Sequence, residues 1–157
     1  MEIHSAHGYL LNQFYSPLAN HRSDDYGPQS VENRTRFHRE VLQAVRRAAG
    51  EDFPVAVRLG GCDYQEGGST LEDSTAACRI LAESGTDLLH LTGGMNGFVR
   101  PGHQEPGYFQ EMSRAARQAV QIPVLLTGGV TTLAQAQALL EQGAADLIGV
   151  GRAIFRD

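Results

Sequence analysis

The sequence predicts an α/β protein made of repeated parallel β/α units. Short apolar runs alternate with stretches of helical character, three of the runs end in a glycine pair, and a fourth is followed by Gly151-Arg152. Runs that are apolar along their whole length are typical of parallel strands buried on both faces. Glycines at the ends of successive strands favour a barrel built from one repeated unit. A dinucleotide-binding fold has little support, because Gly-x-Gly-x-x-Gly follows none of the runs.

Four strands are expected at the apolar runs, and a fifth is indicated by the short apolar start at residues 1–3. The four runs cover 55–59, closed by Gly60-Gly61; 87–92, closed by Gly93-Gly94; 122–127, closed by Gly128-Gly129; and 146–150, followed by Gly151-Arg152. In β/α folds the functional groups lie at the C-terminal ends of the strands. The glycine pairs therefore mark the edge where we expect the site.

The stretches between these strands predict helices at about 30–49, 71–84, 108–120 and 132–142. The last of them has Thr132 as an N-cap and Gly143 at its far end, which are residue types that start and stop helices. We expect right-handed connections between successive parallel strands.

Composition limits the class of protein. The 157 residues fit one domain, 41% of them are apolar, and the formal net charge is −5, which gives a nucleic-acid partner no electrostatic support. No run of 18 apolar residues and no signal peptide is visible, so we expect a cytoplasmic protein without a membrane partner. Cys62 and Cys78 lack metal-ligand spacing and are expected to be reduced and structural.

Lysine is absent, and all 13 basic residues are arginines. This excludes Schiff-base and pyridoxal phosphate chemistry, which need a lysine amine, and it excludes a Walker-type phosphate loop. A phosphate group would have to be held by backbone N–H groups and arginine.

The first candidate site is the segment His4-Ser-Ala-His7-Gly-Tyr9, which directly follows the short initial strand. Two imidazole N–H groups can hold a substrate oxygen on which negative charge develops, and a phenol nearby can deliver a proton. Two other interpretations remain. The three residues can be polar members of a surface turn, or the histidines can be metal ligands, although a zinc site usually needs three or four.

The second candidate site combines Gly128-Gly129 with Gly151-Arg152, after the last two strands. In barrels this position often binds phosphate, because backbone N–H groups and a helix N-terminus face the anion, and Arg152 can add a charge-assisted hydrogen bond. The alternative is that these glycines only end strands.

Arg58 lies inside an apolar strand, where a guanidinium must be paired or must contact an anion or an electron-rich ligand. A salt bridge to Glu2 across the barrel is an equally good interpretation. His90 and Thr92 lie at a strand end and could line the pocket, and His90 is expected to be an interior histidine. Asp63 is expected to be a loop or capping residue.

These residues carry a resemblance to the Old Yellow Enzyme family of flavin-dependent ene-reductases and NADH:flavin oxidoreductases, nearest its bacterial 2,4-dienoyl-CoA reductase branch. The matching segments are Glu2 to Phe14, Ser16-Pro17, Asn20, Arg22, Asp24, Tyr26-Gly27, Glu32-Asn33-Arg34, Val57-Arg58-Leu59 and Gly149 to Ala153. The resemblance implies an eight-stranded TIM barrel that binds FMN at its C-terminal face and is reduced by NAD(P)H. One local departure is the loop Tyr26-Gly-Pro-Gln-Ser30, which is one residue longer than usual in the family.

The resemblance also implies roles for individual residues. His4 and His7 would hydrogen-bond the oxygen of an enone or enoyl thioester, and Tyr9 would protonate the carbon next to that carbonyl. Arg58 would lie beside the flavin ring and stabilise its anionic reduced form. The FMN phosphate would be bound by Gly128, Gly129, Gly151 and Arg152. Hydride would pass from flavin N5 to the substrate β-carbon.

The resemblance covers only the C-terminal half of an FMN-binding TIM barrel, from the end of the family's fourth strand to its eighth, and we assign residues 1–157 to that half. Five strands cannot close an eight-stranded barrel, so their edges need a cover, either a second copy of the chain or a missing N-terminal half. Two alternatives to a flavoenzyme stay open. They are a non-catalytic partial barrel and a flavin-free, phosphate-binding barrel.

Overall fold

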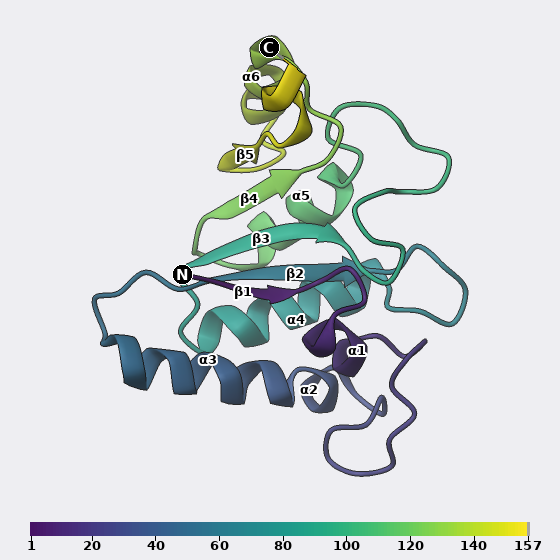
Figure 1. Ribbon diagram of the computed structural model, residues 1–157, viewed down its shortest axis with the longest axis vertical. Coiled ribbons are helices and arrows are strands. Elements are labelled where there is room, and N and C mark those ends of the chain that lie inside the picture. The colour runs from purple at the N-terminus through teal and green to yellow at the C-terminus, as the bar shows by residue number, and fades with distance from the viewer. Residues whose placement is uncertain (157) are drawn as a thin grey trace.

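The computed structural model describes residues 1–156, and its centre is a five-stranded parallel sheet whose strands follow one another in chain order (Figure 1). The strands are β1 (Glu2–Ser5), β2 (Ala56–Cys62), β3 (Leu88–Gly93), β4 (Val124–Thr127) and β5 (Leu147–Gly149). In register, His4 lies opposite Arg58, and Arg58 lies opposite His90. The predicted parallel β/α organisation of a partial barrel is confirmed.

The strand ends differ from the expectation at one glycine pair. Gly60-Gly61 does not close its strand, because β2 continues to Cys62 with a shift of register between Gly60 and Cys62. At Gly60 a side chain would collide with the backbone of Gly93 and Gly94. Gly60 therefore allows β3 to pack closely, while Gly61 leaves room for the side chains of Ser74 and Met112.

Six α-helices and one short 3-10 helix are assigned within residues 1–156. They are α1 (Leu10–Tyr15), α2 (Val31–Arg34), α3 (Arg36–Ala49), α4 (Leu71–Glu83), α5 (Gln110–Ala119), α6 (Leu133–Glu141) and the 3-10 helix η1 (Arg152–Arg156). The capping predicted for α6 is confirmed, because Thr132 and Gln135 form a capping box and Gly143 has a φ of 67°.

The prediction of one helix over 30–49 is wrong, because Thr35 separates α2 from α3. The Thr35 hydroxyl donates a hydrogen bond to the Val31 carbonyl at 2.7 Å, a side-chain bond that competes with continued helix. Helix α1 was not predicted at all. It is only six residues long and directly follows the histidine segment.

The two faces of the sheet differ in chemistry. One face is apolar and packs against α3, α4 and α5, burying Ile3, Val57, Leu59, Leu89, Leu91, Val124 and Leu126 beneath Leu42, Ala77, Leu81 and Met112. The other face carries Glu2, His4, Arg58, His90, Thr92 and Thr127, because side chains alternate along a strand. The core thus lies on one side of the sheet, and polar groups gather on the other.

Cys62 and Cys78 are both free and buried, as expected. Among residues 1–156, no helix combines the length and the hydropathy that a membrane span requires.

Candidate functional site

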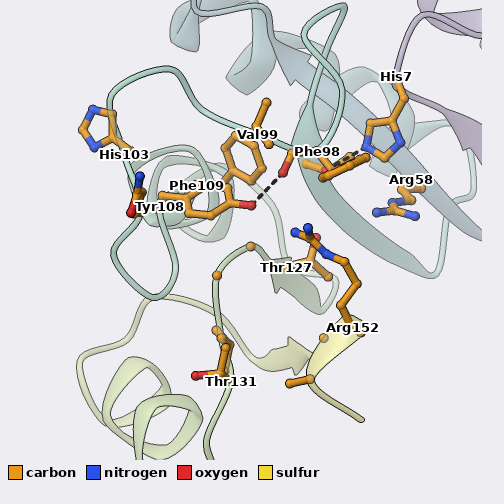
Figure 2. A pocket seen from close by; sticks show the side chains of 18 residues that line it. His7, Arg58, Phe98, Val99, His103, Tyr108, Phe109, Thr127, Thr131 and Arg152 are labelled. Atoms are coloured by element: carbon orange, nitrogen blue, oxygen red, sulfur yellow. Dashed lines mark hydrogen bonds between the residues drawn. The ribbon is translucent and has the colours of Figure 1, made fainter. Parts of the chain in front are cut away.

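A cavity of about 810 Å³ lies at the C-terminal ends of the strands, where the glycine pairs indicated a site (Figure 2). It is lined by residues from every loop that follows a strand except the one after β2. These residues are His7, Arg58, Thr92, Phe98, Val99, His103, Gln104, Tyr108, Phe109, Thr127, Gly128, Gly129, Val130, Thr131, Gly149, Gly151, Arg152 and Ala153. The volume is that of a site for a cofactor or a drug-sized ligand.

The turn after β1 brings His4, His7 and Tyr9 together. The ring centroids of His4 and His7 are 5.3 Å apart, and those of His4 and Tyr9 are also 5.3 Å apart. His7 has a φ of 60°, and Gly8 follows at 77°, so two successive residues take the left-handed conformation. A non-glycine residue in that region is a strained feature that is often found at functional sites.

Asn12 holds this turn, and sequence reasoning gave it no role. Its buried amide oxygen accepts a hydrogen bond from the Gly8 N–H at 2.8 Å, while Gln13 donates to the Gly8 carbonyl at 2.7 Å. Asn12 is three residues after the N-cap of α1, the position from which a side chain reaches back in a capping box. That spacing is the feature of the sequence from which the role of Asn12 could have been predicted.

Both imidazoles are neutral at neutral pH. Burial, followed by the nearby Arg58 guanidinium, lowers the pKa of His7 to about 4, and the same two causes lower the pKa of His4. Neutral imidazoles can still donate one N–H each to a substrate oxygen. Nε2 of His7 is 3.0 Å from the hydroxyl of Thr92, a residue 85 positions away that was expected to line the pocket and does so.

Of these three residues only His7 lines the cavity, while His4 and Tyr9 are exposed beside it. Tyr9 retains 64% of its accessible surface. The surface-turn interpretation therefore describes part of the geometry, although the three rings do converge. A metal centre gains no support, because no three potential ligands cluster anywhere in the described residues 1–156.

Arg58 points into the cavity from the inner face of β2 (Figure 2). The salt bridge to Glu2 is wrong, because the Glu2 carboxylate instead lies 2.7 Å from Nδ1 of His90. Within residues 1–156 Arg58 forms no salt bridge, and its buried Nε has no hydrogen-bond partner. A guanidinium that has no salt bridge and an Nε without a hydrogen-bond partner is suited to bind an electron-rich ligand in the cavity.

The glycine turn after β4 is shaped by Tyr108, which sequence reasoning missed. Gly128 and Gly129 have φ values of 130° and 69°, and a Cβ on either would lie 2.8–2.9 Å from the Tyr108 ring. The Tyr108 hydroxyl donates to the carbonyl of Phe98 at 2.6 Å. The packing of the Tyr108 ring therefore requires glycine at both positions. The binding of an anion to the main chain of this turn would also require glycine there.

The turn after β5 has more space. A Cβ on Gly151 would meet no atom within 4 Å, and Arg152 follows it at the start of η1. The Arg152 guanidinium lies over the Phe98 ring at 4.8 Å, and that ring is also 6.2 Å from the ring of His7. Phe98 comes from the loop between β3 and α5, which carried no recognisable signal in the sequence.

Three N–H groups at the start of α6 already have hydrogen-bond partners. Its Gln135 N–H is bonded to the Thr132 hydroxyl, and the Thr131 and Thr132 N–H groups are bonded to the Gln135 side chain. An anion would instead meet the two glycine turns and Arg152.

Curated relatives match along the whole chain. The NADPH dehydrogenase of Bacillus pumilus is 41% identical, and the chain covers 45% of that protein. The NADH oxidase of Thermoanaerobacter brockii is 35% identical, and 25% of it is covered. The chain thus spans less than half the length of the curated relatives it matches.

Solved structures agree in fold. The Old Yellow Enzyme homologue from Zymomonas mobilis is 30% identical with a TM-score of 0.72, over 96% of this chain and 41% of that one. A 2-naphthoyl-CoA reductase is 27% identical with a TM-score of 0.82, over 94% of this chain and 23% of that one.

The expected resemblance is confirmed by the family match, which extends over residues 1–157. The oxidoreductase relatives and the partial barrel with a cavity at its carboxyl edge agree with that match. The chain belongs to the NADH:flavin oxidoreductase / NADH oxidase family.

Proposed function

We propose that this chain carries the flavin-binding and proton-donating half of an enzyme that reduces activated alkenes with NAD(P)H. The observation that supports this is one cavity shared by an unpaired Arg58, the neutral imidazole of His7, and the glycine turns beside Arg152. FMN, the cofactor of the family, would supply hydride transfer there.

The residues present fit FMN. Arg58 offers an unsatisfied cation to the electron-rich edge of the flavin ring. Gly128, Gly129, Gly151 and Arg152, which line the same cavity, would hold the phosphate, with open space beside Gly151.

The substrate side follows from the turn after β1. His4 and His7, both neutral, would donate N–H groups to the carbonyl oxygen of an enone or enoyl thioester, and Tyr9 would protonate the carbon beside that carbonyl. The exposure of Tyr9 leaves its phenol free to reach a bound substrate. A cytoplasmic location and self-pairing through the sheet edges remain predictions.

The first test is flavin retention. The purified full chain is mixed with FMN, passed through gel filtration, and examined for a retained flavin absorption band. A retained band supports the proposal, and alkene reduction is then assayed. Loss of all flavin would contradict it and favour a non-catalytic partial barrel, or a flavin-free barrel that binds another phosphorylated ligand.

Arg152 gives a prediction specific to the phosphate. Arg152→Gln should weaken FMN binding about tenfold or more, because a charge-assisted hydrogen bond to the phosphate is lost. Riboflavin, which lacks the phosphate, should bind the variant and the unaltered chain equally well. Titrations of flavin fluorescence measure both affinities, and equal FMN affinity for the two proteins would remove Arg152 from the phosphate site.

Tyr9 gives a prediction specific to proton transfer. Tyr9→Phe should slow alkene reduction about a hundredfold, since a general acid contributes about 10²–10⁴ in rate, while flavin reduction by NAD(P)H stays nearly unchanged. Rapid-mixing absorbance separates the two half-reactions. Tyr26→Phe is the matched control, because that phenol bonds Glu40 away from the cavity. Equal losses in both half-reactions of Tyr9→Phe would refute the assignment.

A further inference from the structure

Thr127 occupies the middle of the cavity wall. It is the last residue of β4, it directly precedes the glycine turn assigned to phosphate, and it faces the same side of the sheet as Arg58 two strands away (Figure 2). Arg58, Thr127 and Gly128 line the same cavity, and Thr127 is adjacent to Gly128 in the chain. Nothing in the roles considered so far uses Thr127.

A chain of hydrogen-bonding groups runs behind Thr127 across the inner face of the sheet. The Glu2 carboxylate is 2.7 Å from Nδ1 of His90, and Nε2 of the same ring is 3.2 Å from the Thr127 hydroxyl. His90 is buried, with 8% of its surface accessible, whereas the Glu2 side chain keeps 41% of its surface accessible. The three residues come from β1, β3 and β4.

The direction of these hydrogen bonds follows from their partners. A carboxylate can only accept, so Nδ1 of His90 carries the proton and Nε2 is left as an acceptor. Burial lowers the pKa of His90 despite the opposing effect of Glu2, which keeps this neutral form at neutral pH. The Thr127 hydroxyl therefore points its proton inward, to Nε2 or to the Leu91 carbonyl at 3.3 Å. Its lone pairs are left for the cavity.

Gly149 helps to fix that orientation. A Cβ at Gly149, the cross-strand partner of Thr127 on β5, would collide with the Thr127 methyl group. Because the methyl fills the space above Gly149, the hydroxyl is directed to the His90 side. Thr127 is thus an oriented acceptor in the cavity wall, next to the glycine turn after β4.

FMN would bring a matching donor to this cavity. A polyol chain with three hydroxyl groups joins its ring to its phosphate. We propose that Thr127 accepts a hydrogen bond from a hydroxyl of this polyol chain, and that Glu2 and His90 are positioning residues that hold Thr127 as the acceptor. This inference rests on the proposed function and adds a cofactor-binding residue to it.

The test compares three flavins that share the ring. Thr127→Val keeps the shape and removes the hydroxyl, so it should weaken FMN and riboflavin about tenfold, the loss expected for one buried hydrogen bond. Lumiflavin, which has a methyl group in place of the polyol, should bind the variant and the unaltered chain alike. Thr127→Ser keeps the hydroxyl and should retain most of the affinity for FMN.

The positioning role is tested by non-additivity. His90→Phe alone should also weaken riboflavin but not lumiflavin, and it should add little in a chain that already carries Thr127→Val, because both changes remove one interaction. Full additivity of the two losses would overturn the role of His90.

The outcomes separate this inference from the proposed function. An unaltered chain that binds no flavin contradicts both. An unaltered chain that binds FMN, with Thr127→Val leaving the FMN and riboflavin affinities unchanged, overturns the inference alone. An equal loss for lumiflavin also overturns it, since the effect would then be one of packing.

Discussion

At the scale of single residues, Asp63 does more than the loop or capping role expected of it. Its buried carboxylate accepts from the Ser16 hydroxyl at 2.6 Å, from the N–H and hydroxyl of Ser69 at 2.8 and 2.9 Å, and from the Met95 N–H at 2.7 Å. One side chain thereby joins the end of α1 at Ser16, the loop that follows β2, and the loop that follows β3, which also carries Phe98.

Asp63→Asn should lower the free energy of unfolding by about 3 kcal/mol, because an amide nitrogen would face donors that then lose their acceptor. Urea denaturation measures the change. Asp25→Asn is the control, because the side chain of Asp25 is 81% exposed and its ion pair with Arg36 should contribute little. Equal stability of Asp63→Asn and the unaltered chain would show that the loops are held by other contacts.

The candidate site was predictable where its residues are close in sequence. His4, His7 and Tyr9 converge because six positions and a glycine turn bring them together. Thr92 was expected only to line the pocket and Thr127 had no assigned role, since their contacts span 85 and 37 positions and depend on the register of the sheet. The pairing of Arg58 with Glu2 failed for the same reason. The register sets His4 opposite Arg58 and lets Glu2 reach His90.

At the scale of elements, a buried contact between the Ser5 hydroxyl on β1 and Nε2 of His38 on α3 ties the helix to the sheet. His38 is 1% exposed, and burial lowers its pKa to about 4 from an ordinary value of 6.5. Because the folded state disfavours the proton, the neutral ring contributes stability above pH 6.5, and this stability is lost as the pH falls toward 4.

We therefore expect the free energy of unfolding to drop by about 3 kcal/mol between pH 7 and pH 4 through His38 alone. Urea denaturation across this range measures the slope. His38→Gln should flatten it, whereas His103→Gln should not, because His103 lies in an exposed pair with Glu105. A slope that survives His38→Gln unchanged would assign the acid sensitivity to other groups.

Elements were predictable where the hydrophobic pattern is long. The four apolar runs identified β2 to β5 because burial in a parallel sheet imposes a continuous apolar stretch. Helix α1 and the interruption at Thr35 were missed because each depends on one side chain bonding to nearby backbone, which leaves little mark on periodicity.

At the scale of the whole molecule, the cavity links four of the five strands through their loops, so a ligand that fills it should stabilise the folded state as a unit. At 100 times its dissociation constant, FMN should add about 2.7 kcal/mol to the free energy of unfolding. For a chain of this length that corresponds to a rise of about 5–10 °C in Tm. Thermal denaturation followed by far-UV circular dichroism measures it.

Adenosine monophosphate, which has a phosphate but no flavin ring, is the control and should raise Tm much less. A rise as large with the control as with FMN would contradict a site built for the flavin ring, and it would favour a general phosphate-binding site. Absence of any rise with saturating FMN would contradict ligand-linked stability altogether.

The chemical difference between the two faces of the sheet also affects how the sequence of such a chain can evolve. The apolar side and its helices carry the folding free energy, while Arg58, His90, Thr92 and Thr127 project from the opposite side of the same strands. Substitutions on that inner side alter what the cavity binds without opening holes in the packed layer. New ligand preferences can therefore arise on this fold without changes to the packed side of the sheet.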